Sequence, residues 1–424
     1  MKKFLFAVLI LTFAGAAYAQ SAGAELDFYK KEAQGADKKL LSAIADTLGY
    51  WAARNHALPI TDDALFLKGD IEVRTKNYPA AAITLLRHKY EYPKSANQEL
   101  AGLLLSTTIA NIERAKKPAL EKLAAQNISA AAPLESRLAA FLSDATNLDL
   151  KNNFAALFAE YQNFFARFPS YEDNDKLELM LGDLYRAAKN YQAAIMQYRK
   201  VYEIYPSTKY KAASLRMMGD IYGGELKDYA QAMHYYNMVL NDYPASAERG
   251  ITYKHMAILS DNQKDYAGAV GYITSAAELF IKHGQAENAY EALRYKANLL
   301  EKRLKDYSAA ADTLNKTAQL FATSQNKYID TKLKAADIYG KRLKDQYSQI
   351  AAYEDIISNF PSAPAAAQAM FDAAVLYEKT NAPLKARDMY QKLIVEHPSD
   401  PLANRAQKNI ESIDKRQAKE AAKQ

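Results

Sequence analysis

Short motifs recur along this chain at a spacing of 37 to 39 residues. The first has a small residue, an acid, a branched aliphatic residue and a tyrosine, as in the GDLY that begins at Gly182 and the GDIY that begins at Gly219. An Asn-Tyr or Asp-Tyr pair follows in most units, and an aromatic residue before proline closes many of them. A fixed period in this range is typical of a solenoid, in which each repeat packs only against its neighbours.

Each repeat is predicted to form two helices, which we call helix A and helix B. In the clearest repeat, helix A is expected over residues 176–188, where apolar residues such as Leu181 and Leu184 recur at i, i+3 and i+4 spacing. Helix B is expected over residues 191–204 and ends before Pro206, because the residue before a proline disfavours helical backbone. Glycine and proline are sparse in the chain, 15 and 13 of 424 residues, which also favours helices over a turn-rich β-protein.

Small residues at fixed positions predict close packing between the two helices. Gly182 on helix A and Ala194 on helix B leave room for a close approach. Tyr185 and Tyr198 are expected to fill the wedge between the helices and the space against the next repeat. A single helix pair cannot bury its apolar face alone, so the repeats must stack.

This pattern resembles the tetratricopeptide repeat, which has a small residue and an aromatic on helix A, an alanine and an aromatic on helix B, and a closing proline. The resemblance implies an all-α fold, a right-handed α-solenoid of stacked antiparallel helix pairs with a concave groove lined mainly by helix A. The matching positions are Gly182, Tyr185, Ala194, Tyr198 and Pro206; Gly69, Ala81 and Pro93; Gly219, Tyr222, Ala232, Tyr236 and Pro244; and Ala374, Tyr377, Ala386, Tyr390 and Pro398.

The repeats divide the chain into segments of different regularity. Residues 95–169 fit the pattern poorly and are either two degenerate repeats or a joint between two blocks. The expected order is a signal peptide at 1–19, an N-terminal helical cap at 20–60, a first repeat at 61–94, the degenerate segment at 95–169, an array of about six repeats at 170–400 and a C-terminal capping helix with a basic tail at 401–424.

The N-terminus predicts export. Lys2 and Lys3 precede a mostly apolar run at residues 4–17, and Ala17-Tyr18-Ala19 is a cleavage site before Gln20, as in a secretory signal peptide. The chain has no cysteine, which excludes disulfides, thiolate catalysis and attachment of a lipid to an N-terminal cysteine. We therefore expect a soluble protein of the bacterial periplasm that is not a lipoprotein.

Composition and motifs predict a protein without catalytic chemistry. The net charge is +6, but lysines and acids are interspersed, which does not indicate nucleic-acid binding. The six histidines are scattered, and no nucleotide-binding, zinc-protease or serine-hydrolase motif occurs. We expect no cofactor and no metal ion, and rate an enzyme as the least favoured of three hypotheses.

The leading hypothesis is a scaffold that binds a peptide or protein segment through side chains of helix A that do not face helix B. The aromatic-Pro-Ser ends of several repeats resemble those of periplasmic proteins that support outer-membrane β-barrel assembly and of the Tol–Pal-associated division coordinator, which implies a role in envelope assembly or maintenance. The alternative is a glycan- or peptidoglycan-binding module, because tyrosine-rich grooves suit sugar stacking. The candidate partner-binding residues are Lys176, Asp183, Arg186, Arg216, Asp220, Lys254, Asp261, Arg294 and Glu301.

Overall fold

The computed structural model describes residues 2–148 and 153–421, and in these ranges the chain is helical with no β-strand. The prediction of an all-α solenoid built from antiparallel helix pairs is confirmed. Outside the described residues lie the first residue of the predicted signal peptide, four residues of the degenerate segment and the end of the basic tail. The chain divides into two compact units, which we call unit 1 (Met1–Ile221) and unit 2 (Tyr222–Gln424).

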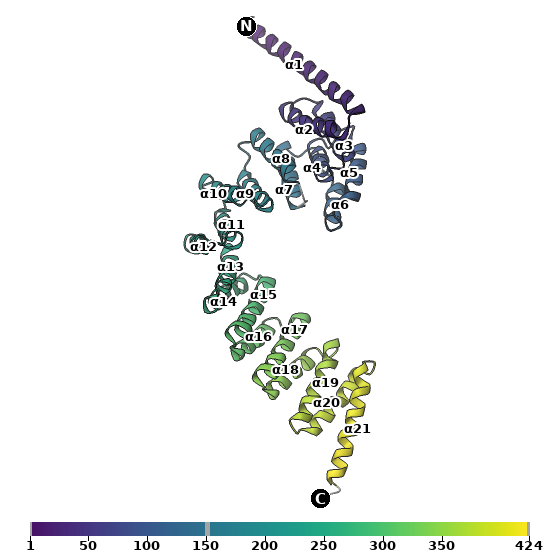
Figure 1. Cartoon of the computed structure of the whole chain (residues 1–424), viewed down its shortest axis with the longest axis vertical. Helices are drawn as coiled ribbons and strands as arrows, with labels where there is room; N and C mark the ends of the chain where they lie inside the picture. The colour runs from purple at the N-terminus through teal and green to yellow at the C-terminus, as the bar shows by residue number, and fades with distance from the viewer. Residues whose placement is uncertain (1, 149–152, 422–424) are drawn as a thin grey trace. The chain divides into compact units, whose positions relative to one another are not determined.

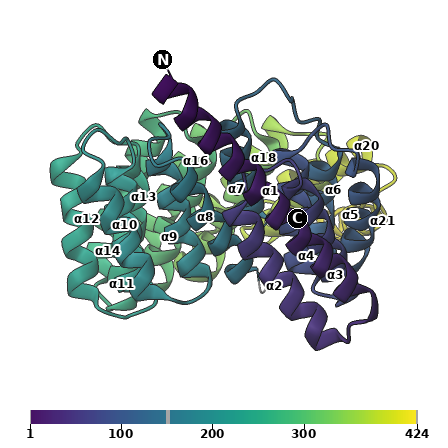
Figure 2. The same ribbon diagram turned by 90° about the horizontal axis from the view of Figure 1, so that it is seen from above.

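Unit 1 contains the predicted signal peptide, cap, first repeat and degenerate segment. Its helix pairs lie side by side, as α3 and α4 do in both views (Figure 1 and Figure 2). A short 3-10 turn, η1 (Arg114–Lys116), precedes α6. The helices are α1 (Lys2–Gly35), α2 (Lys38–Arg54), α3 (Thr61–Arg74), α4 (Tyr78–Glu91), α5 (Gln98–Asn111), α6 (Lys117–Ala125), α7 (Leu134–Asn147), α8 (Phe154–Arg167), α9 (Asn174–Ala187), α10 (Tyr191–Ile204) and α11 (Lys211–Gly224), whose last turn belongs to unit 2.

Unit 2 is a regular succession of helix pairs in which each helix from α12 onward packs on the next (Figure 1). Two π-helical segments, η2 (Leu299–Leu304) and η3 (Tyr339–Leu343), continue α15 and α17. The helices are α12 (Tyr229–Asp242), α13 (Glu248–Asn262), α14 (Tyr266–Lys282), α15 (Ala286–Asn298), α16 (Tyr307–Leu320), α17 (Gln325–Ile338), α18 (Gln346–Asn359), α19 (Pro364–Lys379), α20 (Pro383–Glu396) and α21 (Pro401–Ala421).

The two helices of the clearest repeat, α9 and α10, approach each other closely at Gly182, as predicted. A Cβ atom at Gly182 would clash with the ring of Tyr198, which is fully buried. The same device recurs in unit 2, where a Cβ at Gly250 would lie 2.7 Å from the ring of Phe280. Glycine is therefore used on helix A to admit a bulky side chain of helix B.

Tyr185 differs from the expectation that it packs against the next repeat. Its ring lies against the preceding helix α8, with centroid distances of 5.5 Å to Phe154 and 5.6 Å to Phe158. The reason is geometric, because Gly182 and Tyr185 lie on different faces of α9. Gly182 faces helix B, α10, whereas Tyr185 faces the preceding helix, α8.

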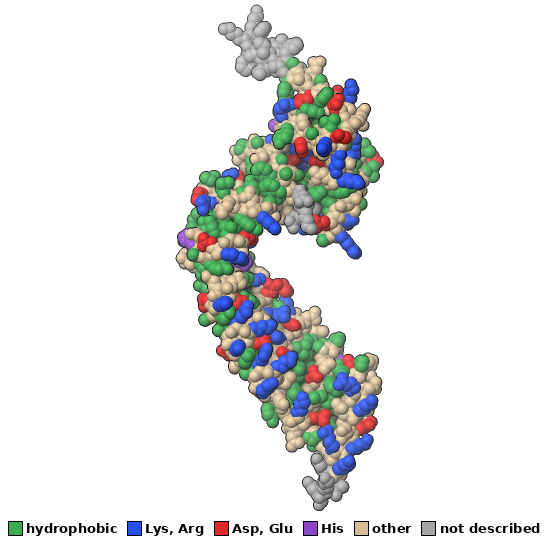
Figure 3. Space-filling view, in the orientation of Figure 1, with side chains coloured by type: hydrophobic (Ala, Val, Ile, Leu, Met, Phe, Trp, Pro, Cys, Tyr) green, Lys and Arg blue, Asp and Glu red, His purple; other side chains and the backbone are tan. Residues whose placement is uncertain are grey.

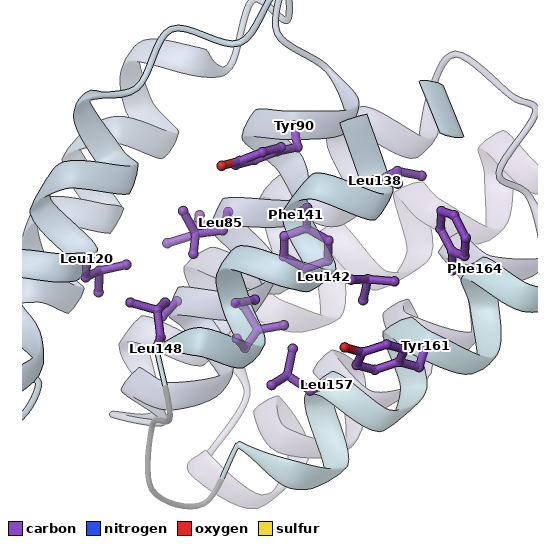
Figure 4. Packing of buried hydrophobic residues seen from close by; sticks show 14 of the residues in the cluster. Leu85, Tyr90, Leu120, Leu138, Phe141, Leu142, Leu148, Leu157, Tyr161 and Phe164 are labelled. Atoms are coloured by element: carbon purple, nitrogen blue, oxygen red, sulfur yellow. The ribbon is translucent and has the colours of Figure 1, made fainter. Parts of the chain in front are cut away.

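The degenerate segment interrupts the regular succession. Helix α4 packs against α5, as a regular stack requires, but also against α7 and α8. Figure 4 shows Phe141 of α7 lying between Tyr90 of α4 and Phe164 of α8, and the Tyr90 and Phe141 rings are 6.1 Å apart. Helices α5 and α6 therefore form a side excursion from the row of α4, α7 and α8.

A buried network of charges joins α4 to α8 beside this core. The Arg87 guanidinium donates to Glu91 at 2.9 Å and to Glu160 at 3.1 Å, and Arg167 donates to the other oxygen of Glu91 at 2.8 Å. Arg87, Glu91 and Arg167 side chains are each no more than 6 % exposed. Burial alone would raise the pKa of Glu91, but Arg87 and Arg167 lower it below its usual value.

Seven of the described turns between helix A and helix B share one backbone feature, a residue other than glycine in the left-handed region, which is lysine in six of them. Lys189 has φ of 61°, and the next residue, Asn190, caps helix B by accepting from the backbone N–H of Ala193. Left-handed backbone costs an L-residue other than glycine roughly 1 kcal/mol, because Cβ crowds the following carbonyl. The other turn residues of this kind are Lys76, Lys227, Lys264, Lys305, Lys344 and Asn381.

Substituting glycine for one of these lysines is expected to stabilise the fold. Lys189→Gly should raise the free energy of unfolding by about 0.5–1 kcal/mol, because glycine adopts positive φ without strain. Lys176→Gly, on the exposed face of α9, should lower it by about 1 kcal/mol. Chemical denaturation followed by circular dichroism distinguishes the two signs, and a loss of stability in Lys189→Gly would contradict the strain.

Candidate functional site

The predicted partner-binding residues lie on the first helices of successive pairs, in two groups that belong to the two units. Some of these side chains are exposed and others are buried, so they do not form a uniform surface. Lys176, Asp183 and Arg186 are on α9, Arg216 and Asp220 on α11, Lys254 and Asp261 on α13, Arg294 on α15 and Glu301 on η2.

In unit 1, Asp183 points toward helix B rather than away from it. Its Oδ1 accepts the hydroxyl of the buried Tyr198 at 2.6 Å, which satisfies the one polar atom of that ring. Burial raises the pKa of Asp183 above its usual value, although Tyr198, Arg186 and Arg216 act in the opposite direction. Asp183 therefore anchors the helix pair, and of the three predicted residues on α9 only Lys176 is exposed.

On α11, Arg216 and Asp220 interact with each other. Arg216 donates to Asp220 at 2.6 Å one turn apart on the same helix, and the Asp220 side chain is 8 % exposed. This pair gives α11 an internal contact, and Asp220 offers little surface to a partner.

In unit 2, the predicted residues bridge neighbouring A helices. Lys254 on α13 donates to Glu291 on α15 at 2.9 Å, and Arg294 on α15 lies 3.4 Å from Asp330 on α17. Asp330 also accepts the hydroxyl of Tyr290 at 2.9 Å. Because these pairs are partly exposed, each contributes little to the free energy of folding. They nevertheless hold the charges at fixed positions on the surface formed by the A helices α13, α15 and α17, which we call the helix-A face.

A second set of bridges recurs where helix A ends, and we call each one a turn clasp. Arg303 of η2 lies 3.0 Å from Asp261 of the preceding helix A and 5.6 Å from the centre of the Tyr266 ring. Arg342 of η3 makes the same two contacts in the next repeat, because it lies 3.7 Å from Glu301 and 5.7 Å from the centre of the Tyr307 ring. Each clasp combines an ion pair with a cation–π contact between consecutive repeats.

The acids of the clasps are also held by other groups. Asp261 accepts the hydroxyl of Tyr295 at 3.1 Å, and burial with this hydrogen bond raises the pKa of Tyr295 to about 12. Glu301, only 4 % exposed, lies 3.3 Å from the ammonium of Lys334 on α17. Asp261 and Glu301 therefore join repeats together and are poorly placed to bind a partner.

Arg303 and Arg342 are not among the candidate residues that the repeat pattern predicts, although they hold consecutive repeats together. The signal was present in the near copies KRLKDYSAAA from Lys302 and KRLKDQYSQIAA from Lys341, which place the same arginine in two consecutive repeats. Both arginines lie in the π-helical segments that continue helix A, Arg303 in η2 and Arg342 in η3.

Two features of the described residues bear on other functions. Nowhere in residues 2–148 and 153–421 do three His, Asp or Glu side chains gather closely enough to hold a metal ion. Among the described helices, none is both long and apolar enough to cross a membrane.

Comparison with known proteins agrees with the repeats described above. Family models described as tetratricopeptide repeat match residues 48–96, 175–245 and 350–401. No curated protein matches the chain significantly.

Solved structures that resemble the chain are themselves distant in sequence. A tetratricopeptide repeat protein from Parabacteroides merdae is 16 % identical, with 65 % of this chain and 98 % of that chain covered and a TM-score of 0.34. The C-terminal part of a TPR repeat-containing protein from Cytophaga hutchinsonii is 14 % identical, with 63 % and 98 % covered and a TM-score of 0.39. PilW, a type IV pilus biogenesis factor, is 14 % identical, with 65 % and 98 % covered and a TM-score of 0.30.

The family therefore follows from the chain's own repeats. Gly182 of α9 and Tyr198 of α10 pack together as the repeat predicts, and both lie inside one of the matched ranges. Further matches fall on α3 with α4 and on α18 to α20. The chain therefore carries tetratricopeptide repeats, in residues 48–96, 175–245 and 350–401.

Proposed function

We propose that this protein is a non-enzymatic scaffold of the bacterial cell envelope that binds a peptide or protein partner on the helix-A face, in envelope assembly or maintenance. Tetratricopeptide repeats indicate protein–protein interaction, and the predicted signal peptide supports the location. The observation that carries the proposal is the fixed row of half-exposed charges across α13, α15 and α17.

The charged side chains of this row can exchange their intramolecular ion pairs for ion pairs with a binding partner. Glu291, Arg294 and Asp330 side chains are 61 %, 52 % and 51 % exposed, so water screens their present ion pairs. Exposed pairs are worth about 0–1 kcal/mol each, and a partner can replace them with its own charges at little cost. The rigid helices beneath keep these charges in place, which lowers the entropy cost of binding.

Site-specific photo-crosslinking in living cells tests the proposal. A photo-reactive amino acid at Arg294 is expected to capture an envelope protein, and Lys254→Glu should weaken that capture while circular dichroism stays unchanged. The matched control is Leu320, an equally accessible residue (48 % exposed) on helix B of the same repeat. Capture of the same protein from both positions, or from neither, would contradict a partner site on the helix-A face.

A further inference from the structure

The net positive charge of the chain is concentrated in one part of unit 2. Residues 294–344 contain twelve Lys and Arg and five Asp and Glu, so this segment alone exceeds the +6 of the whole chain. Figure 3 shows Lys and Arg side chains gathered over the middle of unit 2, with fewer acidic side chains among them. The segment covers the A-to-B turn after η2 and ends at Lys344, the first residue of the turn after η3.

These turns lie side by side along one edge of unit 2. Successive A helices run in the same direction, so their ends meet the same edge, and the turn clasps at Arg303 and Arg342 join each turn to the one before. We call the surface at these ends the turn edge. It consists of Lys264 after α13, Lys302, Leu304 and Lys305 at η2, and Leu343 and Lys344 at η3.

The acids of the turn edge are engaged in capping, whereas its lysines are not paired. Asp265, Asp306 and Asp345 each accept a backbone N–H of the following helix at 2.9–3.0 Å, and the partial positive charge of that helix end offsets their own. The lysines, by contrast, are exposed, and no carboxylate of the described residues lies within 4.0 Å of the ammonium of Lys264, Lys302, Lys305 or Lys344. The turn edge therefore presents cations without matching anions.

Leucines project between these cations. Leu304 is 42 % exposed and Leu343 is 37 % exposed, and each stands between basic residues in the sequence KRLK. A leucine in water at a turn tip gains free energy only if an apolar layer receives it. Cations beside such a leucine match a surface on which anionic groups overlie an apolar layer.

We propose that the turn edge docks unit 2 on a membrane surface rich in anionic phospholipid. Lysines near such a surface are attracted to the headgroup phosphates, and the leucines reach the boundary between headgroups and acyl chains. A soluble acidic protein segment would satisfy the lysines but would supply no apolar layer for both leucines. The binding is peripheral and independent of the protein partner on the helix-A face.

Co-sedimentation of the full chain with vesicles tests this proposal. The protein should bind vesicles containing 30 % phosphatidylglycerol more tightly than pure phosphatidylcholine vesicles, by about tenfold or more, and high salt should remove the difference. The ratio between the two vesicle types cancels apolar contributions from the N-terminal residues. The variant Lys302→Gln, Lys305→Gln, Lys344→Gln should lose most of this ratio, and Leu304→Ser with Leu343→Ser should lower binding at low salt.

The control variant removes the same charge elsewhere in unit 2. Lys282, Lys316 and Lys408 are also exposed and lie away from the turn edge, so their replacement by glutamine should leave the ratio within about twofold of the original. Equal losses in both triple variants would show a nonspecific charge effect and overturn the proposal. Failure to prefer phosphatidylglycerol vesicles, together with retention on immobilised polyglutamate, would assign the surface to an acidic protein instead.

Discussion

Replacing Glu91 by alanine is expected to lower the free energy of unfolding of unit 1 by about 3–5 kcal/mol. The substitution removes the anion that faces both Arg87 and Arg167; Arg87 keeps its ion pair with Glu160, but both guanidinium groups stay in a site with almost no access to water. A buried charge without its partner costs far more than the original pair contributed. The only tryptophan, Trp51, is buried in α2, so urea unfolding followed by its fluorescence reports on unit 1 alone.

The matched control is another ion pair of unit 1 that water can reach. Asp70 and Arg74 lie 3.5 Å apart on α3 with side chains 33 % and 40 % exposed, and Asp70→Ala should cost no more than about 0.5 kcal/mol. If Glu91→Ala cost as little as Asp70→Ala, the network would not be sealed from water in solution.

Gly182→Ala is expected to destabilise the α9–α10 pair by about 1–3 kcal/mol, the usual cost of overpacking a filled core. The added methyl group meets the Tyr198 ring, which cannot turn aside because its hydroxyl is bonded to Asp183. Thermal unfolding followed by circular dichroism should show the loss.

Gly102→Ala is the same chemical change, but we expect it to raise the free energy of unfolding rather than lower it. Gly102 is exposed on α5 with no atom near the position of a Cβ, so alanine should stabilise unit 1 by about 0.5–1 kcal/mol through helix propensity. Replacing Tyr198 with leucine should also make room at Gly182, so the two substitutions together should cost less than their sum. Strict additivity would mean that the glycine serves another purpose.

The helix pairs and their closest contacts could be predicted from sequence because they depend on short-range spacing. Gly182 and Tyr198 are sixteen residues apart, within one helical hairpin, so periodicity alone places them together. The capping residues Asn190 and Asp265 can be predicted in a similar way, because each directly precedes the start of a helix B.

Contacts between distant segments could not be predicted in this way. Arg87 meets Glu160 across 73 residues, and that distance includes the excursion of α5 and α6, whose length follows no period. The partners of Lys254 and Arg294 lie on the next helix A, and their identity depends on how far each repeat is shifted relative to the last. The π-helical segments η2 and η3 consist of residues with ordinary helical composition, so the sequence pattern does not predict them.

The turn clasps give unit 2 a junction that can be copied. In the repeat of α15 and α16, Arg303 contacts the preceding repeat. Arg342 of the following repeat contacts Glu301 and Tyr307 of this one. A chain that duplicated the stretch between these two arginines would insert a repeat whose two ends already fit. The similar sequences at this junction would let such an insertion lengthen the array without any new interface having to arise.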